Sequence, residues 1–174
     1  MRLLGAILAG GQSRRFGSDK AQALIGGERL IDLVASALEG QCETLAVCGR
    51  EEPGFLCLPD LPETGLGPLG GLNAALHHAL AEGCDAVLSS GCDVPDLPRD
   101  LAQRLRGDGA AHVAEQPVVG LWPVALAPLC AGFLQSGGRS LYGFGEHVGA
   151  RRVAFSPPLR NVNSPGDLPA PPIQ

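Results

Sequence analysis

Aromatic residues are scarce in this chain of 174 residues, at 4% of the total, although hydrophobic residues as a whole reach 45%. A core of this composition must be built mainly from leucine, valine and alanine. Charged residues are also few, at 18%, and such a composition is typical of a globular chain rather than a disordered one. We therefore expect a single domain over residues 1–174, a length that can enclose a sizeable core.

An excess of positive charge is absent as well. The formal net charge is −5 and the pI is about 5.3, which argues against nucleic acid or a membrane as the main partner. No apolar run reaches the roughly 20 residues that span a bilayer. The apolar stretch 3–9 is too short for a signal peptide and has no clear cleavage site. The sequence therefore predicts a cytoplasmic protein.

The six cysteines include no C-x-x-C pair, which argues against a zinc site. Most of them lie inside apolar runs, where a cysteine behaves as a small hydrophobic residue. This distribution indicates a reducing compartment.

Short apolar segments alternate with segments of helical periodicity along the chain. Strands are expected at 3–8, 44–48, 55–58, 86–89, 110–114, 118–122 and 153–155, and helices at 30–38, 69–80, 97–105, 128–134 and 140–147. The strand at 118–122 lies between Pro117 and Pro123, which favours a sheet edge. The alternation predicts an α/β fold with three α/β/α layers and a mostly parallel sheet. Residues 169–174 are proline-rich and are expected to form a loose tail.

A glycine-rich loop, L-A-G-G-Q-S-R-R-F-G-S-D-K-A over residues 8–21, follows the first expected strand. In parallel sheets, ligands bind beyond the carboxyl ends of the strands. Glycines let backbone N–H groups approach phosphate oxygens, and Arg14, Arg15 and Lys20 add positive charge. Neither a P-loop nor a dinucleotide fingerprint can be laid on this segment.

Lys20 is the single lysine among the 13 basic residues of the chain. All the other basic residues are arginine, so a lone lysine inside this loop indicates a site that needs a compact ammonium group. The alternative is an ordinary solvated loop lysine, and composition alone does not separate the two.

The loop resembles the signature L-A-G-G-x-S-x-R-M-G-x-D-K of molybdenum cofactor guanylyltransferases, the MobA family, with Phe16 in place of the usual methionine. Further matches follow in chain order: G-P-L-G-G-L at 67–72, C-D-V-P at 92–95, Q-P at 116–117, and N-V-N-S-P-G-D-L at 161–168. The loop alone is similar to that of cytidylyltransferases and sugar nucleotidyltransferases. The combination with N-x-N near the C-terminus is more specific.

The resemblance implies a nucleotide-diphospho-sugar transferase (Rossmann-like) fold. It also implies transfer of GMP from GTP to the phosphate of molybdopterin, or of Mo-molybdopterin, with Mg²⁺ as the metal. Expected protein partners are other molybdenum-cofactor biosynthesis proteins and molybdoenzyme chaperones. The reaction needs no general base, because a phosphate monoester is largely ionised near neutral pH. Charge neutralisation and positioning supply the catalysis instead.

Family knowledge also assigns expected roles to residues, which we carry over by motif. The nucleotide is expected at Leu8, Ala9, Gly10, Gly11, Lys20, Asp60 and Asp93; catalysis at Lys20, Arg15 and Asp93; Mg²⁺ at Asp93; and the acceptor at Asn161 and Asn163. Each acidic or amide residue has a structural alternative: Asp93 as a helix cap, Asp60 as a turn acid between prolines, and the asparagines as backbone hydrogen-bond partners.

The chain departs from the family at residues 47–50, V-C-G-R, where many members have an asparagine that helps to hold the nucleotide. This departure weakens the distinction between guanine and cytosine. A cytidylyltransferase of the same fold therefore stays open, as does a non-catalytic carrier of nucleotide or molybdopterin. The presence of both Lys20 and Asp93 speaks against a carrier, because simple binding needs no metal-binding carboxylate.

Overall fold

The computed structural model describes residues 1–11 and 19–167, except for the side chain of Pro165. Its centre is a seven-stranded sheet with strand order β5-β4-β1-β6-β8-β7-β9. The strands are β1 (Leu3–Leu8), β4 (Thr44–Cys48), β5 (Leu56–Leu58), β6 (Ala86–Gly91), β7 (Ala111–Val113), β8 (Gln116–Pro123) and β9 (Arg151–Val153). Only β8 runs antiparallel to its neighbours, β6 and β7. A small hairpin of β2 (Leu24–Ile25) and β3 (Glu28–Arg29) lies apart from this sheet.

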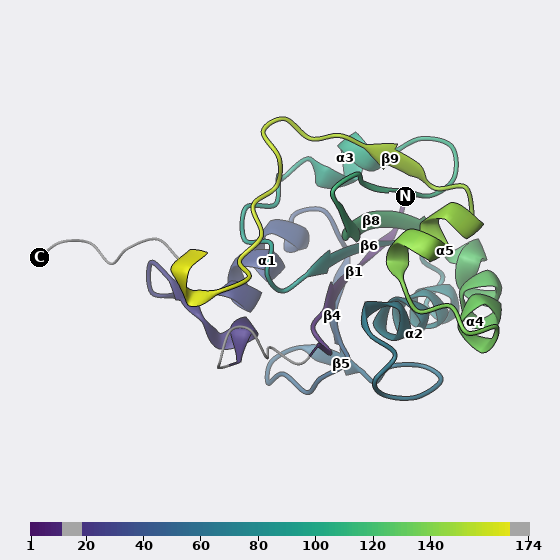
Figure 1. The fold of residues 1–174 in the computed structure, drawn as a ribbon, viewed down its shortest axis with the longest axis horizontal. Helices are drawn as coiled ribbons and strands as arrows, with labels where there is room; N and C mark the ends of the chain where they lie inside the picture. Colours follow the sequence, from purple (N-terminus) through teal and green to yellow (C-terminus); the bar gives the residue numbers. More distant parts are fainter. Residues whose placement is uncertain (12–18, 168–174) are drawn as a thin grey trace, which may run out of the picture.

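Helices cover both faces of the sheet, which gives the three layers expected from the sequence (Figure 1). On one face, α1 (Leu30–Glu39) and α3 (Leu101–Leu105) bury their apolar residues in a first hydrophobic cluster. On the other face, α2 (Pro68–Ala81), α4 (Ala127–Gln135) and α5 (Leu141–His147) share a second cluster. Three short 3₁₀ turns complete the described elements: η1 (Lys20–Gln22), η2 (Val124–Leu126) and η3 (Pro165–Asp167).

The two central strands, β1 and β6, are buried along their whole length because helices cover them on both faces. Leucine, valine and alanine dominate the core, as the composition predicts. The single tryptophan, Trp122, is fully buried, and its indole N–H donates to the Ser89 hydroxyl oxygen at 2.9 Å. This bond satisfies the one polar group that the tryptophan brings into the core.

The structure corrects three expectations about the elements. Strand β8 lies inside the sheet rather than at its edge. Pro117 lies where the β7–β8 register shifts, and Pro123 lies at the end of the β6–β8 pairing. At these positions the missing proline N–H does not remove a hydrogen bond from the sheet. Helix α3 begins only at Leu101, because the chain first makes a turn in which the Leu101 N–H donates to the carbonyl of Pro98. Strand β9 begins two residues earlier than expected, at Arg151.

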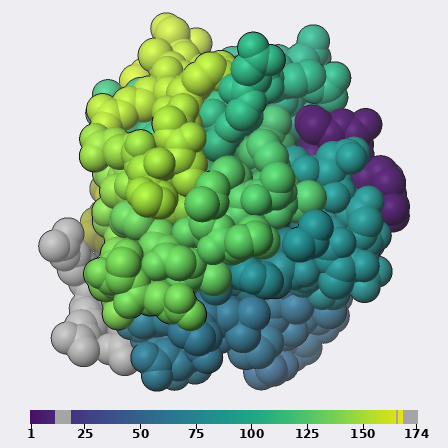
Figure 2. Space-filling model, turned by 90° about the vertical axis from the view of Figure 1, so that its right-hand side faces the viewer, coloured from purple at the N-terminus to yellow at the C-terminus, as the bar shows by residue number. Residues whose placement is uncertain are grey.

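Both ends of the described chain pack against distant segments. Arg2 donates from Nη1 to the carbonyls of Glu82 and Gly83 at 3.3 and 3.1 Å, and Figure 2 shows the first residues beside the segment after α2. Near the other end, the buried Val162 packs on Leu30, and Ile25 of the β2–β3 hairpin packs against this pair. No helix in the described part of the chain is both long and apolar enough to cross a membrane.

Candidate functional site

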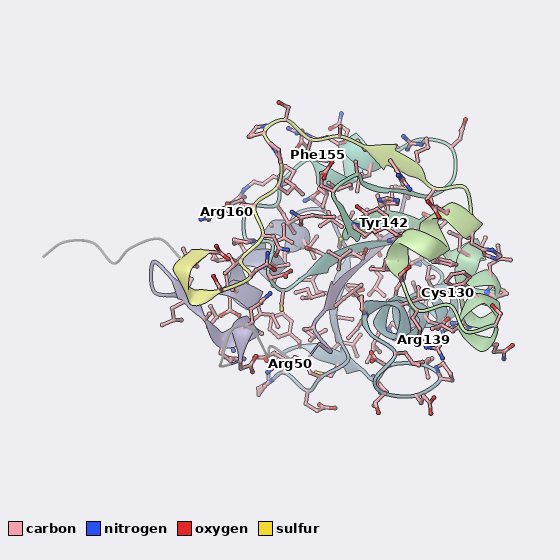
Figure 3. The ribbon with its side chains drawn as sticks, viewed as in Figure 1. Arg50, Cys130, Arg139, Tyr142, Phe155 and Arg160 are labelled. Carbon is pink, nitrogen blue, oxygen red and sulfur yellow. The ribbon has the colours of Figure 1, made fainter. Side chains whose placement is uncertain are left out.

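A cavity of about 600 Å³ opens at the carboxyl ends of β1 and β6. This is where an α/β sheet is expected to bind its ligand. The cavity brings together most of the site residues expected from the sequence: Leu8, Ala9, Gly10, Gly11, Lys20, Asp93 and Asn161. Arg50 lines it on the side of β5, whereas Arg139 and Tyr142 line it on the side of α4 and α5 (Figure 3).

The segment after β1 is held close to the end of β4. The Ala9 N–H donates to the carbonyl of Cys48 at 3.0 Å. Gly49 has a φ of +86°, and a Cβ added to it would lie 2.6 Å from the Cα of Gly10. Position 49 therefore requires glycine for both conformation and space. The predicted catalytic residue Arg15, like Arg14, lies outside the described residues.

Lys20 and Asp93 face each other in the cavity. The Lys20 Nζ lies 3.1 Å from the Asp93 Oδ2, and the two side chains are 16% and 21% exposed. Lys20 is placed by the η1 turn, whose N-cap is Asp19, and Asp93 follows the end of β6. The capping alternative for Asp93 does not hold, because its carboxylate pairs with Lys20 and α3 begins eight residues later, at Leu101.

Asp60 does not line the cavity and lies beneath its floor. It is 7% exposed, and a Cβ added to Gly10, Gly49, Gly70 or Gly71 would come within 3.4 Å of its side chain. Burial raises the pKa of this carboxyl. Within residues 1–11 and 19–167, no hydrogen-bond donor of the protein reaches it. This buried position among four glycines differs from the exposed turn position that the flanking prolines suggest for Asp60.

Arg50 ends the stretch 47–50 after β4, which lacks the asparagine expected there from the family resemblance. Its two terminal nitrogens donate to both carboxylate oxygens of Asp19, at 2.7 and 2.6 Å. The same guanidinium lies 3.4 Å from Glu52. The pairing raises the pKa of Arg50 and lowers that of Asp19, chiefly through the hydrogen bonds between them.

The two expected acceptor residues are placed differently. Asn161 lines the cavity, and its Oδ1 is buried without a hydrogen-bond partner among the described residues. Asn163 is exposed and does not line the cavity, and its backbone N–H donates to Asp167 at 2.8 Å. The buried Val162 between them donates its N–H to the carbonyl of Asp93 at 2.9 Å. This bond fixes the segment that carries Asn161 next to the end of β6.

Sequence reasoning missed most of the wall opposite Arg50. Gln116 donates to the carbonyl of Leu159 at 2.6 Å, and the Tyr142 hydroxyl donates to the carbonyl of Ala114 at 2.6 Å. Arg139 and Ser140 also line this wall. The family match at 116–117 was not assigned a role. Arg139 follows a pair of glycines, a pattern that predicts a turn but not the direction of the arginine side chain.

Metal ligation at this site rests on few protein groups. In the part of the chain that is described, no group of three or more histidine, cysteine or acidic residues could hold a metal ion. The cavity does contain the Asp93 carboxylate, which follows a buried strand and faces the open volume. Mg²⁺ commonly takes one or two protein carboxylates and completes its shell with water and phosphate oxygens, so this donor set fits that ion.

Comparison with known sequences gives a consistent family. The family model described as "MobA-like NTP transferase domain" matches residues 5–150. A molybdenum cofactor guanylyltransferase of Cereibacter sphaeroides is 42% identical over 97% of this chain and 94% of its own length. The corresponding protein of Rhodobacter capsulatus is 37% identical over the same shares of the two chains.

Solved structures share the fold at low sequence identity. Molybdopterin-guanine dinucleotide biosynthesis protein A from Archaeoglobus fulgidus superposes with a TM-score of 0.75 at 19% identity, over 96% of this chain and 94% of that one. The 2-C-methyl-D-erythritol 4-phosphate cytidylyltransferase of Thermus thermophilus gives a TM-score of 0.69 at 17% identity, over the same shares. The expected nucleotidyltransferase fold is therefore confirmed.

Proposed function

Since this chain belongs to the MobA-like NTP transferase family of nucleotidyltransferases, we propose that it transfers GMP from GTP to the phosphate of molybdopterin, or of Mo-molybdopterin. The products are molybdopterin guanine dinucleotide and pyrophosphate. The acceptor phosphate oxygen forms a bond to the α-phosphorus as the bond between the α-phosphorus and the bridging oxygen to the β-phosphate breaks. We expect the reaction to take place in the cytoplasm.

The observation that carries this proposal is the Lys20–Asp93 pair, 3.1 Å apart beside the backbone of Gly10 and Gly11 in one cavity. Two anionic substrates must meet there, so their charge has to be neutralised. The Lys20 ammonium and the backbone N–H groups supply part of that neutralisation, and Arg15 is proposed to add to it. Mg²⁺, held by Asp93, supplies further charge when it is bound.

A covalent enzyme intermediate is not needed for this chemistry. The cavity contains one thiol, that of Cys92, among its described lining residues, and burial raises the pKa of Cys92 to about 11. The thiol is therefore protonated at neutral pH and is a poor nucleophile. Direct attack by the acceptor phosphate, already ionised near neutral pH, agrees with this environment.

The two substrates are proposed to occupy different parts of the cavity. The nucleotide lies over Leu8, Ala9, Gly10 and Gly11. Asp60 stays a predicted residue of the guanosine site, although it is buried and does not line the cavity in this structure. The acceptor lies toward Asn161 and the wall that includes Arg139. Asn163 stays a predicted acceptor residue, although it is exposed outside the cavity in this structure.

The second candidate is a cytidylyltransferase, which the similar fold of the Thermus enzyme and the lack of the family's asparagine at 47–50 keep open. Pyrophosphate release with GTP, CTP or ATP, in the presence of molybdopterin and Mg²⁺, separates the candidates. We expect GTP to give the fastest release and the tightest binding by titration calorimetry. Faster release and tighter binding with CTP would replace the guanylyl assignment, and binding without release would indicate a carrier.

A further inference from the structure

The loop after β4 makes hydrogen bonds to residues on both sides of Lys20. Arg50 binds Asp19, the residue before Lys20, and Glu52 binds Gln22, two residues after it. Lys20 itself begins the η1 turn, which ends at Gln22. The single lysine of the chain therefore lies between two residues that are fixed from outside their own segment.

The bond between Arg50 and Asp19 is two-pronged, with distances of 2.7 and 2.6 Å. Asp19 also caps η1, because its Oδ1 accepts from the Ala21 N–H at 3.2 Å. Both terminal nitrogens of Arg50 are engaged by Asp19, and its Nε is buried without a hydrogen-bond partner among the described residues. A planar bidentate contact fixes orientation as well as distance.

Glu52 supports the same loop from within. Its side chain is only 2% exposed, and its Oε1 accepts from Arg29 at 2.6 Å. Its Oε2 accepts from Gln22 at 3.0 Å and lies 3.4 Å from Arg50. A carboxylate buried this far from water needs charged partners, and it has one on each side, Arg29 at the start of α1 and Arg50 at the cavity. Glu52 therefore links the rigid helix to the loop.

On the premise of the proposed function, we propose that Arg50 and Glu52 are positioning residues that set the Lys20 ammonium against the triphosphate. Arg50 acts through Asp19 and Lys20 rather than by touching the nucleotide. The resulting activity depends on where the turn holds Lys20, and a displacement of about 1 Å at a reacting group can cost up to about 100-fold in rate.

A mutant cycle between Arg50 and Lys20 tests this proposal. The variants are Arg50→Ala, Lys20→Ala and the double variant, measured by nucleotide affinity in calorimetry and by kcat/KM for pyrophosphate release. We expect each single variant to lose about 10-fold or more in kcat/KM. The double variant should be no worse than Lys20→Ala, because Arg50 has nothing left to position. Multiplied losses in the double variant would overturn the proposal and assign Arg50 a direct contact with nucleotide.

Two further variants separate positioning from folding. Asp19→Asn keeps the oxygen that caps η1 but removes the charge that Arg50 binds, so it should reproduce the loss of Arg50→Ala with little change in Tm. Arg50→Lys keeps the charge without the two-pronged contact and should fall between Arg50→Ala and wild type. Wild-type kcat/KM in Asp19→Asn would contradict the proposal. Arg104→Ala, which breaks an exposed arginine–aspartate pair with Asp100, is the matched control.

Failure of the proposed function gives a different result from failure of this inference. If the protein prefers CTP or ATP, the cycle is measured as affinity for that nucleotide, and Arg50 and Lys20 should still be non-additive. If GTP is the substrate and the losses multiply, only the positioning role is wrong.

Discussion

Lys20 and Asp93, 73 positions apart in the chain, form a partly buried ion pair in the cavity, with Nζ and Oδ2 3.1 Å apart. The carboxylate that is expected to hold Mg²⁺ thus already has a cation of the protein beside it. Both groups line the cavity in which we propose that the triphosphate and its metal bind, so each should affect a different measurable property.

Lys20→Arg should lower turnover by about 10-fold or more, because the planar guanidinium cannot place a compact charge where the ammonium lies. Steady-state release of pyrophosphate measures this loss. Arg104→Lys, the reverse exchange at an exposed ion pair, should leave turnover unchanged. Wild-type turnover in Lys20→Arg would show that the position of the lone lysine is an accident of composition.

Asp93→Asn keeps the size of the side chain and removes its charge. The apparent affinity for Mg²⁺ and the turnover should fall together, by about 10-fold or more each. Stability should change by less than about 1 kcal/mol, because the residue lies in a partly exposed loop. Titration of activity with Mg²⁺, next to thermal unfolding, checks both. Loss of turnover with unchanged Mg²⁺ dependence would remove Asp93 from metal binding.

Asn161→Ala should impair transfer to molybdopterin by about 10-fold and leave GTP affinity nearly intact, since its Oδ1 lacks a partner among the described residues and Asn161 lines the part of the cavity proposed for the acceptor. Asn163→Ala should have the same kind of effect but a smaller one, because that side chain lies outside the cavity. Transfer rates and GTP calorimetry on both variants are the measurements. An equal loss of GTP binding in both would mean that these residues serve the nucleotide instead.

Asp60→Asn should stabilise the free protein at neutral and higher pH. Burial raises the pKa of Asp60, so the folded state binds this proton more tightly than the unfolded state does. Stability from this group is therefore present at low pH and lost as pH rises through the folded pKa. The Tm advantage of the variant should be clear at about pH 8 and should shrink toward about pH 4. A Tm difference that is constant with pH would contradict the burial argument.

Gly49→Ala should destabilise the fold and weaken nucleotide binding together. The residue has a φ of +86°, and a Cβ would lie 2.6 Å from the Cα of Gly10. Gly54→Ala is the matched control, because Gly54 has a φ of +89° but open space around it. The control should cost about 1–2 kcal/mol from backbone strain alone, and Gly49→Ala about 1–3 kcal/mol more from overlap. Equal losses in denaturant unfolding would show that the contact with Gly10 relaxes freely.

The sheet could be predicted from local pattern because its central strands contain short apolar runs, as at 3–8 and 86–88, although the second strand was expected at 86–89 and extends to Gly91. The position of β8 in the sheet could not be predicted. Its prolines are compatible with an edge strand, but also with an inner strand whose pairing is interrupted at those residues, and only the pairing with β7 distinguishes the two. Among site residues, the segment around Gly10 and the pair Lys20 and Asp93 follow from their places after β1 and β6.

The contacts between those residues were not predictable. Lys20 and Asp93 meet only through the parallel order of the sheet, and no local pattern gives a distance of 3.1 Å. Arg139 and Tyr142 reach the cavity because the chain returns over it after β8, a path that periodicity does not reveal. The role that we propose for Arg50 depends on a partner 31 positions earlier, Asp19.

The buried Val162 donates its N–H to the carbonyl of Asp93, so the C-terminal segment contacts the site although it adds no strand to the sheet. A chain shortened to end at residue 155 would keep every strand of the seven-stranded sheet, yet it would lose Asn161 and the backbone bond beside the expected metal ligand. Truncation from this end should therefore abolish catalysis before it abolishes folding. A folded but inactive fragment is the product to expect from proteolysis there.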